Sequence, residues 1–144
     1  MADTEVTGAC LCRAVRFRVA LPTLFCGHCH CSMCRRNHGA GFVTWVAVAK
    51  KQFGLTSGEE LLTCFESSDH GTRRFCRVCG SSLFCESSHH ADVIDVVLAN
   101  LDGELVGLEP QANIYLSDRV GWVTVDESLP QLGGDSGVEP LHTG

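Results

Sequence analysis

The chain has 144 residues, a formal net charge of −6 and 44% hydrophobic residues. A chain of this size folds as one domain that buries roughly 70% of the surface exposed by its unfolded form, so its core needs no disulfide staples. Basic runs are no longer than two residues, which argues against nucleic-acid-binding and membrane-surface proteins because both need clustered positive charge.

No part of the sequence has the pattern of a membrane span or an export signal. The longest apolar-leaning stretch, residues 42–49, is far shorter than the ~20 residues that cross a bilayer, and residues 1–5 lack the basic and apolar regions of a signal peptide. We therefore expect a cytoplasmic protein with small-molecule partners, without nucleic acid or membrane, and a homo-oligomer is compatible with this sequence. Ten cysteines in a reducing compartment favour metal binding or catalysis over disulfides.

Short strands are predicted along most of the chain. Between residues 14 and 20, Val15, Phe17 and Val19 alternate with arginines, which is the period of a half-buried strand. Stretches rich in β-branched and aromatic residues, or bounded by turn formers, predict further strands at residues 42–49, 61–66, 72–76, 82–85, 93–98 and 113–116. One short helix is predicted over residues 32–38, with Ser32 as N-cap and Gly39 at its end. The fold class is therefore all-β.

The domain organisation follows from composition. We expect residues 1–6 to be an N-terminal extension and residues 7–132 to form a single folded domain. Residues 133–144 are rich in glycine and polar residues, which predicts a flexible C-terminal tail.

Two cysteine pairs from distant parts of the chain have the spacing of a structural zinc site. Cys10 and Cys12 are one residue apart, and Cys76 and Cys79 form a Cys-x-x-Cys turn followed by Gly80. If the first pair lies on an extended strand, both of its side chains project from one face. The four thiolates then predict a closed tetrahedral site. Unligated core cysteines, or a disulfide oxidoreductase using the second pair, are the alternatives.

The third cysteine cluster offers only three thiolates, from Cys29, Cys31 and Cys34. Three protein ligands and one open position are typical of a catalytic zinc, so we predict a functional metal here. Ligation by His28, His30 or Cys26 would close the site, although the histidines point away from the cysteines if this stretch is extended. Iron is the alternative to zinc in both groups, because all-sulfur sites hold either metal.

Other candidate residues are assigned to the core or the surface. Cys64 and Cys85 lie within strand patterns and are expected to be buried. Phe42 and Trp45 are expected to be core aromatic residues, and His89 and His90 to be exposed in a serine-rich turn.

Five segments of the chain resemble the glutathione-dependent formaldehyde-activating enzyme family, which also includes centromere protein V. They are GACLCRAVRF (8–17), HCHCSMCRR (28–36), FVTW (42–45), RFCRVCG (74–80) and IDV (94–96), in family order, and the resemblance runs from about residue 7 to 125. It implies a β-tent of coiled antiparallel sheets, a structural zinc at the two cysteine pairs and a functional zinc at the three-cysteine cluster. Family members often carry a histidine where this chain has Asn113.

The resemblance implies a zinc-dependent enzyme of the carbon–sulfur lyase type. Glutathione would bind as thiolate at the open position of the zinc held by Cys29, Cys31 and Cys34, and attack formaldehyde or a similar small carbonyl to give S-hydroxymethylglutathione. Arg35 and Arg36 follow directly and are candidates to bind the carboxylates of glutathione, with Arg73, Arg74 and Arg77 as further basic residues beside a metal motif. A non-catalytic zinc-stabilised module that binds thiols, adducts or a protein is the alternative function.

Overall fold

The computed structural model describes residues 5–104 and 107–141 and is mostly β, as predicted. The chain divides into two compact units. The first unit comprises Met1–Phe25 and Val46–Gly107, and the second comprises Cys26–Trp45 and Leu108–Gly144. No helix in the described part of the chain is long and apolar enough to cross a membrane.

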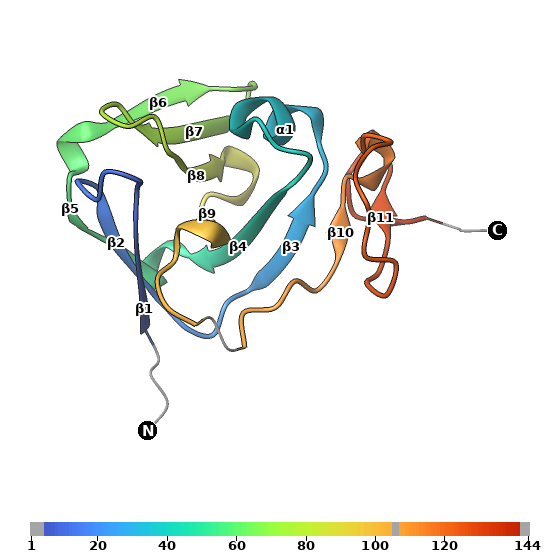
Figure 1. Ribbon diagram of the computed structural model, residues 1–144, viewed down its shortest axis with the longest axis horizontal. Helices are drawn as coiled ribbons and strands as arrows, with labels where there is room; N and C mark the ends of the chain where they lie inside the picture. Colours follow the sequence, from blue (N-terminus) through green and yellow to red (C-terminus); the bar gives the residue numbers. More distant parts are fainter. Residues whose placement is uncertain (1–4, 105–106, 142–144) are drawn as a thin grey trace. The chain divides into compact units, whose positions relative to one another are not determined.

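The first unit contains two groups of antiparallel strands (Figure 1). One has the order β1-β2-β5, from β1 (Glu5–Ala9), β2 (Arg16–Ala20) and β5 (Phe53–Ser57). The other is a meander of β6 (Leu62–Glu66), β7 (Gly71–Cys76), β8 (Ser82–Ser87) and β9 (Val93–Val97). Four single-turn 3₁₀ segments connect them: η1 (Lys50–Gln52), η2 (Glu59–Leu61), η3 (Ser88–His90) and η4 (Leu98–Asn100).

An aromatic cluster forms the core of the first unit. Phe17 of β2 lies edge-on to Phe84 of β8, with ring centroids 4.9 Å apart, and Phe53 of β5 contacts both rings. Phe17 and Val19 are buried while Arg16 and Arg18 are exposed, which confirms the predicted alternation. Burying Phe17 and Phe84 contributes roughly 1.5–3 kcal/mol each, so this cluster stabilises the packing of the two groups of strands against each other.

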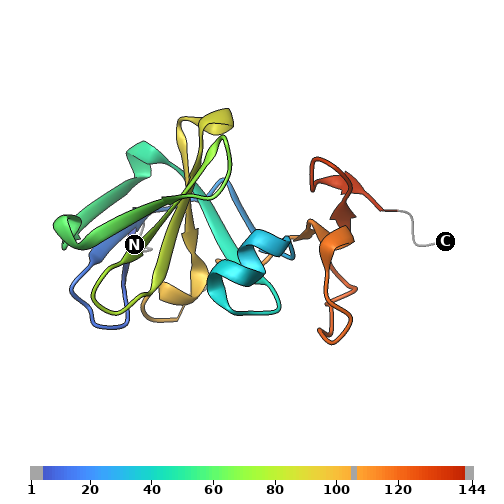
Figure 2. The same ribbon diagram turned by 90° about the horizontal axis from the view of Figure 1, so that it is seen from above.

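The second unit is built around β3 (Phe25–Cys29), whose neighbours are β10 (Asn113–Ile114) and β4 (Val43–Ala49). The β3–β10 pair is parallel, unlike the antiparallel pairs of the first unit. The helix α1 (Ser32–His38) lies in the connection from β3 to β4 (Figure 2). The rest comprises η5 (Leu116–Asp118) and a two-stranded pair, β11 (Leu132–Gly133) with β12 (Glu139–Pro140).

The predicted strands all occur, with ends shifted by a few residues. Five strands were not predicted from the sequence: β1, β3, β5, β11 and β12. The first three each contain a glycine, at Gly8, Gly27 and Gly54, which lowers strand propensity, so pairing with a neighbouring strand decides their conformation. Strand β12 lies within the range expected to be a tail, where Leu141 N–H also donates to Gln131 O at 3.0 Å.

The helix α1 spans the predicted residues but begins differently. Its N-cap is Cys31 rather than Ser32, and the Cys31 sulfur accepts a hydrogen bond from the Cys34 N–H. Gly39 ends the helix in the left-handed region, with φ of 61°, as predicted. As the N-cap, Cys31 lies at the start of the helix that contains Cys34, so two candidate metal ligands lie close together.

Candidate metal centres

Four thiols of the first unit converge into one group, here called the tetrathiol group: Cys10, Cys12, Cys76 and Cys79. All four sulfur atoms lie within 4.8 Å of one another. The Cys10–Cys12 and Cys12–Cys76 sulfur distances are 3.5 and 3.9 Å. A tetrahedral zinc site with Zn–S bonds of about 2.3 Å separates its sulfurs by about 3.8 Å, so this donor set fits a zinc ion.

Two tight turns bring these thiols together. Strand β1 ends at Ala9, so the expected extended conformation of Cys10 and Cys12 is wrong: they lie in a turn closed by Arg13 N–H donating to Cys10 O at 3.0 Å. Gly80, at φ of 79°, closes the Cys76–Cys79 turn through an N–H bond to Cys76 O at 2.8 Å. A turn replaces strand geometry because the chain reverses directly after β1 to pair with β2.

Without a cation, the thiols of the tetrathiol group differ in how readily they ionise. Burial raises the pKa of Cys79, but hydrogen bonds from Ser81 and its neighbours outweigh that effect and lower the pKa to about 5. A backbone hydrogen bond from Ala14 lowers the pKa of Cys12, yet the neighbouring thiols, Cys10 foremost, raise it to about 11. Ionising all four thiols therefore requires a bound cation, which is the chemistry of a closed metal site.

The second unit contains the trithiol group, formed by Cys29, Cys31 and Cys34, whose sulfurs also lie within 4.8 Å of one another. All three residues are buried. The group sits where β3 ends and α1 begins, so strand, N-cap and first helical turn each contribute one thiol. Trp45 Nε1 donates a hydrogen bond to the Cys34 sulfur at 3.4 Å.

Charge within the trithiol group is strongly coupled. Contacts with Cys31 and Cys34 raise the pKa of Cys29, and burial adds to the effect. Three thiolates in such a volume repel one another unless a cation lies between them. The donor set therefore fits a metal with three sulfur ligands.

The neighbours that could close the trithiol group lie outside it in the described residues, although His30 Nδ1 is buried without a hydrogen-bond partner. His28 Nδ1 lies 2.8 Å from Thr44 Oγ1, and His30 Nε2 lies 3.0 Å from Asn113 Oδ1. Burial lowers the pKa of both histidines. Cys26 is buried, and among residues 5–104 and 107–141 neither it nor the two histidines belongs to the three-thiol group.

Comparison with known proteins identifies the family. The family described as glutathione-dependent formaldehyde-activating enzyme matches residues 5–118. The chain belongs to this family. Its match includes all seven cysteines of the two groups.

Individual relatives agree with this membership. A Halomonas elongata protein, provisionally named a glutathione-dependent formaldehyde-activating enzyme, is 25% identical over 83% of this chain and 80% of its own length. An uncharacterized lyase of Schizosaccharomyces pombe is 32% identical over 56% of each chain. A crystal structure of a Rhodobacter sphaeroides protein matches with a TM-score of 0.60 and 26% identity, covering 69% of this chain and 91% of that one.

The basic residues beside the two motifs differ in their contacts. Arg35 is half-buried and bonds the backbone oxygens of His30 and Asp118 at 3.4 Å each, whereas Arg36 is exposed on α1. In the first unit, Arg73 is buried and donates to Ser67 Oγ, and Arg74 pairs with Glu86 at 3.5 Å. Arg35 is therefore hydrogen-bonded to the backbone of the trithiol segment.

The structure changes the assignment of Cys64 and adds a contact or a neighbour to two other residues. Cys64 is exposed rather than buried, because it lies on β6 at the edge of its sheet. Trp45 is buried as expected, but it also reaches a candidate metal ligand. Tyr115 was not predicted as a site residue: burial and then the charges of the trithiol group raise its pKa. Sequence reasoning missed it because 81 or more residues separate it from those cysteines in the chain, and only the β3–β10 pairing brings them together.

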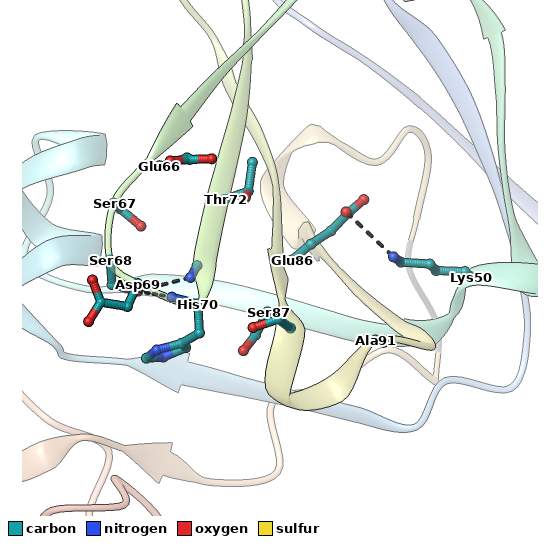
Figure 3. Close-up of a pocket in the computed structure, with 12 residues that line it drawn as sticks. Lys50, Glu66, Ser67, Ser68, Asp69, His70, Thr72, Glu86, Ser87 and Ala91 are labelled. Atoms are coloured by element: carbon teal, nitrogen blue, oxygen red, sulfur yellow. Dashed lines mark hydrogen bonds and ion pairs between the residues drawn. The ribbon is translucent and has the colours of Figure 1, made fainter.

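A polar cavity of about 690 Å³ lies in the first unit, apart from any predicted ligand. Figure 3 shows Lys50 paired with Glu86, at 3.6 Å, on one side and Ser68 bonded to the β6–β7 turn on the other. Its lining consists of serines, charged side chains and His70, without a cysteine among the described lining residues. The lining therefore includes none of the seven cysteines of the two thiol groups.

Proposed function

We propose that this chain is a zinc-dependent enzyme of the carbon–sulfur lyase type. It joins glutathione, or a related thiol, to formaldehyde or a similar small carbonyl, giving S-hydroxymethylglutathione. The observation that supports this proposal most directly is the trithiol group. Its three buried sulfurs converge, and within the described residues no fourth protein ligand joins them. Family membership supports the same reaction class.

The chain's own residues would hold the metal and moderate its charge. Cys29, Cys31 and Cys34 are the proposed ligands, and the N–H groups of Cys34 and of the Trp45 indole donate to two of their sulfurs. A bound zinc would supply the positive charge that keeps a substrate thiol ionised beside the carbonyl carbon. Buried N–H donors spread the negative charge of the ligands, so the site tolerates one further thiolate.

Arg35 and Arg36 are the proposed contacts for the carboxylates of glutathione. The protein's charge of −6 disfavours an anionic substrate unless local positive charge intervenes. Arg35 is held beside the trithiol segment by its bond to His30 O, and Arg36 is exposed one residue later. A guanidinium binds a carboxylate through two parallel hydrogen bonds, which gives both affinity and orientation.

The test replaces the metal of the trithiol group with cobalt, whose thiolate charge-transfer band reports on sulfur ligation. Glutathione should change this band, and S-methylglutathione should change it much less, because a thioether cannot become an anion. Glutathione and formaldehyde should also be consumed with saturation above the uncatalysed rate, and Cys31→Ser should abolish that increment. Equal responses to both ligands, without a rate increment, would favour a non-catalytic binding module.

A further inference from the structure

Tyr115 lies beside the trithiol group because of strand register. Strand β10 runs parallel to β3, with Ile114 opposite Cys29, and His30 N–H donates to Ile114 O at 3.0 Å. Tyr115 is the next residue, so its backbone stands opposite the segment between two of the proposed metal ligands. This placement follows from backbone pairing alone.

The backbone of Tyr115 is held in an unusual conformation. Its φ of 52° and ψ of 33° lie in the left-handed region, where a bulky side chain is rare and costs of order 1 kcal/mol or more. Contacts from the C-terminal hairpin hold it there: Tyr115 N–H donates to Gly137 O at 2.8 Å, and the tyrosine ring packs so closely on Gly137 that a Cβ at that position would clash with it. The fold thus fixes the position of this ring.

The phenol hydroxyl is available to a ligand. Tyr115 is partly exposed, and its hydroxyl makes no hydrogen bond with any residue in the described ranges. A tyrosine phenol ordinarily has a pKa of about 10, so its hydroxyl carries a proton at neutral pH. A protonated phenol is a hydrogen-bond donor.

Several side chains near the trithiol group already make hydrogen bonds. The Trp45 indole N–H donates to Cys34, and the Arg35 guanidinium donates to two backbone oxygens. His30 uses Nε2 on Asn113, whose own amide nitrogen donates to Asp126 O at 3.0 Å. Tyr115 therefore offers an uncommitted neutral donor in this part of the second unit.

We infer that the Tyr115 hydroxyl donates a hydrogen bond to the carbonyl oxygen of the substrate as the thiolate sulfur attacks it. This assignment rests on the proposed function. In that step the C–S bond forms, the C=O π bond breaks, and its electron pair moves to the oxygen. The oxygen then takes up one proton, equal to the proton that glutathione released on forming the thiolate. A donor aimed at the oxygen stabilises the charge that develops there.

The first experiment is Tyr115→Phe, which keeps the ring and removes only the hydroxyl. We expect metal content and glutathione affinity to stay within twofold of wild type, while kcat falls about 100- to 1,000-fold, the order of effect seen when such a donor is removed. A structural role for Tyr115 would instead change metal content or KM. Unchanged kcat in Tyr115→Phe would overturn the inference.

The second experiment observes the hydroxyl directly and does not depend on turnover. Tyr115 is the single tyrosine of the chain, so tyrosine labelled with ¹³C at Cζ gives one NMR signal. With zinc bound, glutathione and formaldehyde together should shift this signal, whereas glutathione alone should shift it much less. No shift under conditions where glutathione binds would overturn the inference.

The two experiments separate this inference from the proposed function. A shifted signal without a rate increment over the uncatalysed reaction would contradict catalysis but support contact of Tyr115 with the adduct. A rate increment that is the same in Tyr115→Phe as in wild type would support catalysis and overturn the role of Tyr115. Absence of glutathione binding would refute both.

Discussion

In the trithiol group, buried N–H groups donate hydrogen bonds to two of the three sulfurs and so reduce the negative charge on them. The Cys34 sulfur receives the indole N–H of Trp45, and the Cys31 sulfur receives the Cys34 N–H. Both acceptors are buried, where a hydrogen bond is worth more than in water. Residues that contact the sulfur ligands, but not the metal itself, should therefore affect metal affinity.

Trp45→Phe should weaken metal binding by the trithiol group about 10-fold, because it removes one donor to a ligand while keeping an aromatic ring in place. Competition with a chromogenic chelator measures this affinity. Trp122→Phe is the matched control, since Trp122 is 76% exposed. Equal losses in both variants would contradict a specific role for the Trp45 N–H.

Asp95 on β9 makes the stability of the first unit depend on pH. Burial raises the pKa of its carboxyl to about 6, against the lowering effects of His90 and Arg73. Because the folded pKa exceeds the ordinary value of 3.8, the folded state binds the proton more tightly, and stability falls as pH rises from about 4 to 6.

Asp95→Asn should therefore stabilise the protein by up to about 3 kcal/mol at pH 8 and make little difference near pH 4. Urea unfolding at the two pH values measures the effect. Asp69→Asn, at an exposed carboxyl of the β6–β7 turn, is the control for removing one carboxylate from the same unit. A destabilised Asp95→Asn at pH 8 would show that the carboxylate is needed in its charged form.

At the scale of elements, the tetrathiol group links parts of the first unit that are distant in sequence. It joins the turn after β1 to the turn after β7, and 64 residues separate Cys12 from Cys76. The trithiol group is local, because β3 and α1 are neighbours in the chain. A crosslink over a long loop restricts the unfolded chain more than a local one does.

Cys76→Ser should therefore unfold the first unit. Structural zinc contributes of order 10 kcal/mol in small metal-bound domains, which is comparable to a domain's whole stability. Cys34→Ser should lose its metal but keep the β circular-dichroism spectrum. Cys64→Ser, an exposed cysteine outside both groups, is the control and should retain fold and metal. If Cys76→Ser and Cys34→Ser unfold alike, the division into structural and functional groups is wrong.

At the scale of the whole molecule, four-plus-three ligands predict two zinc ions per chain with different lability. The tetrathiol ion should resist mild chelation, because all of its positions are filled by protein. The trithiol ion should be lost first, since its remaining position admits a competing ligand. Metal analysis during stepwise chelation measures both ions; iron, or one equally tight zinc, would contradict this prediction. A cytoplasmic location stays a prediction.

Local patterns in the sequence were enough to predict the ranges of many elements and the grouping of the cysteines. The alternation around Phe17 predicted β2, because strand periodicity depends only on residues near one another in the chain. The spacing of the cysteines predicted which thiols converge, because a structural zinc takes a fixed number of ligands. Helix α1 and its end at Gly39 were also predicted from local signals.

Tertiary structure alone decided the features that depend on pairing between distant segments. Strands β1 and β5 exist because β2 pairs with both, and neither has a strong pattern of its own. The turn at Cys10 and Cys12, the Trp45 bond to Cys34 and the position of Tyr115 opposite the trithiol segment follow from strand order and register. Register depends on the summed packing of many side chains, so no local stretch of sequence specifies it.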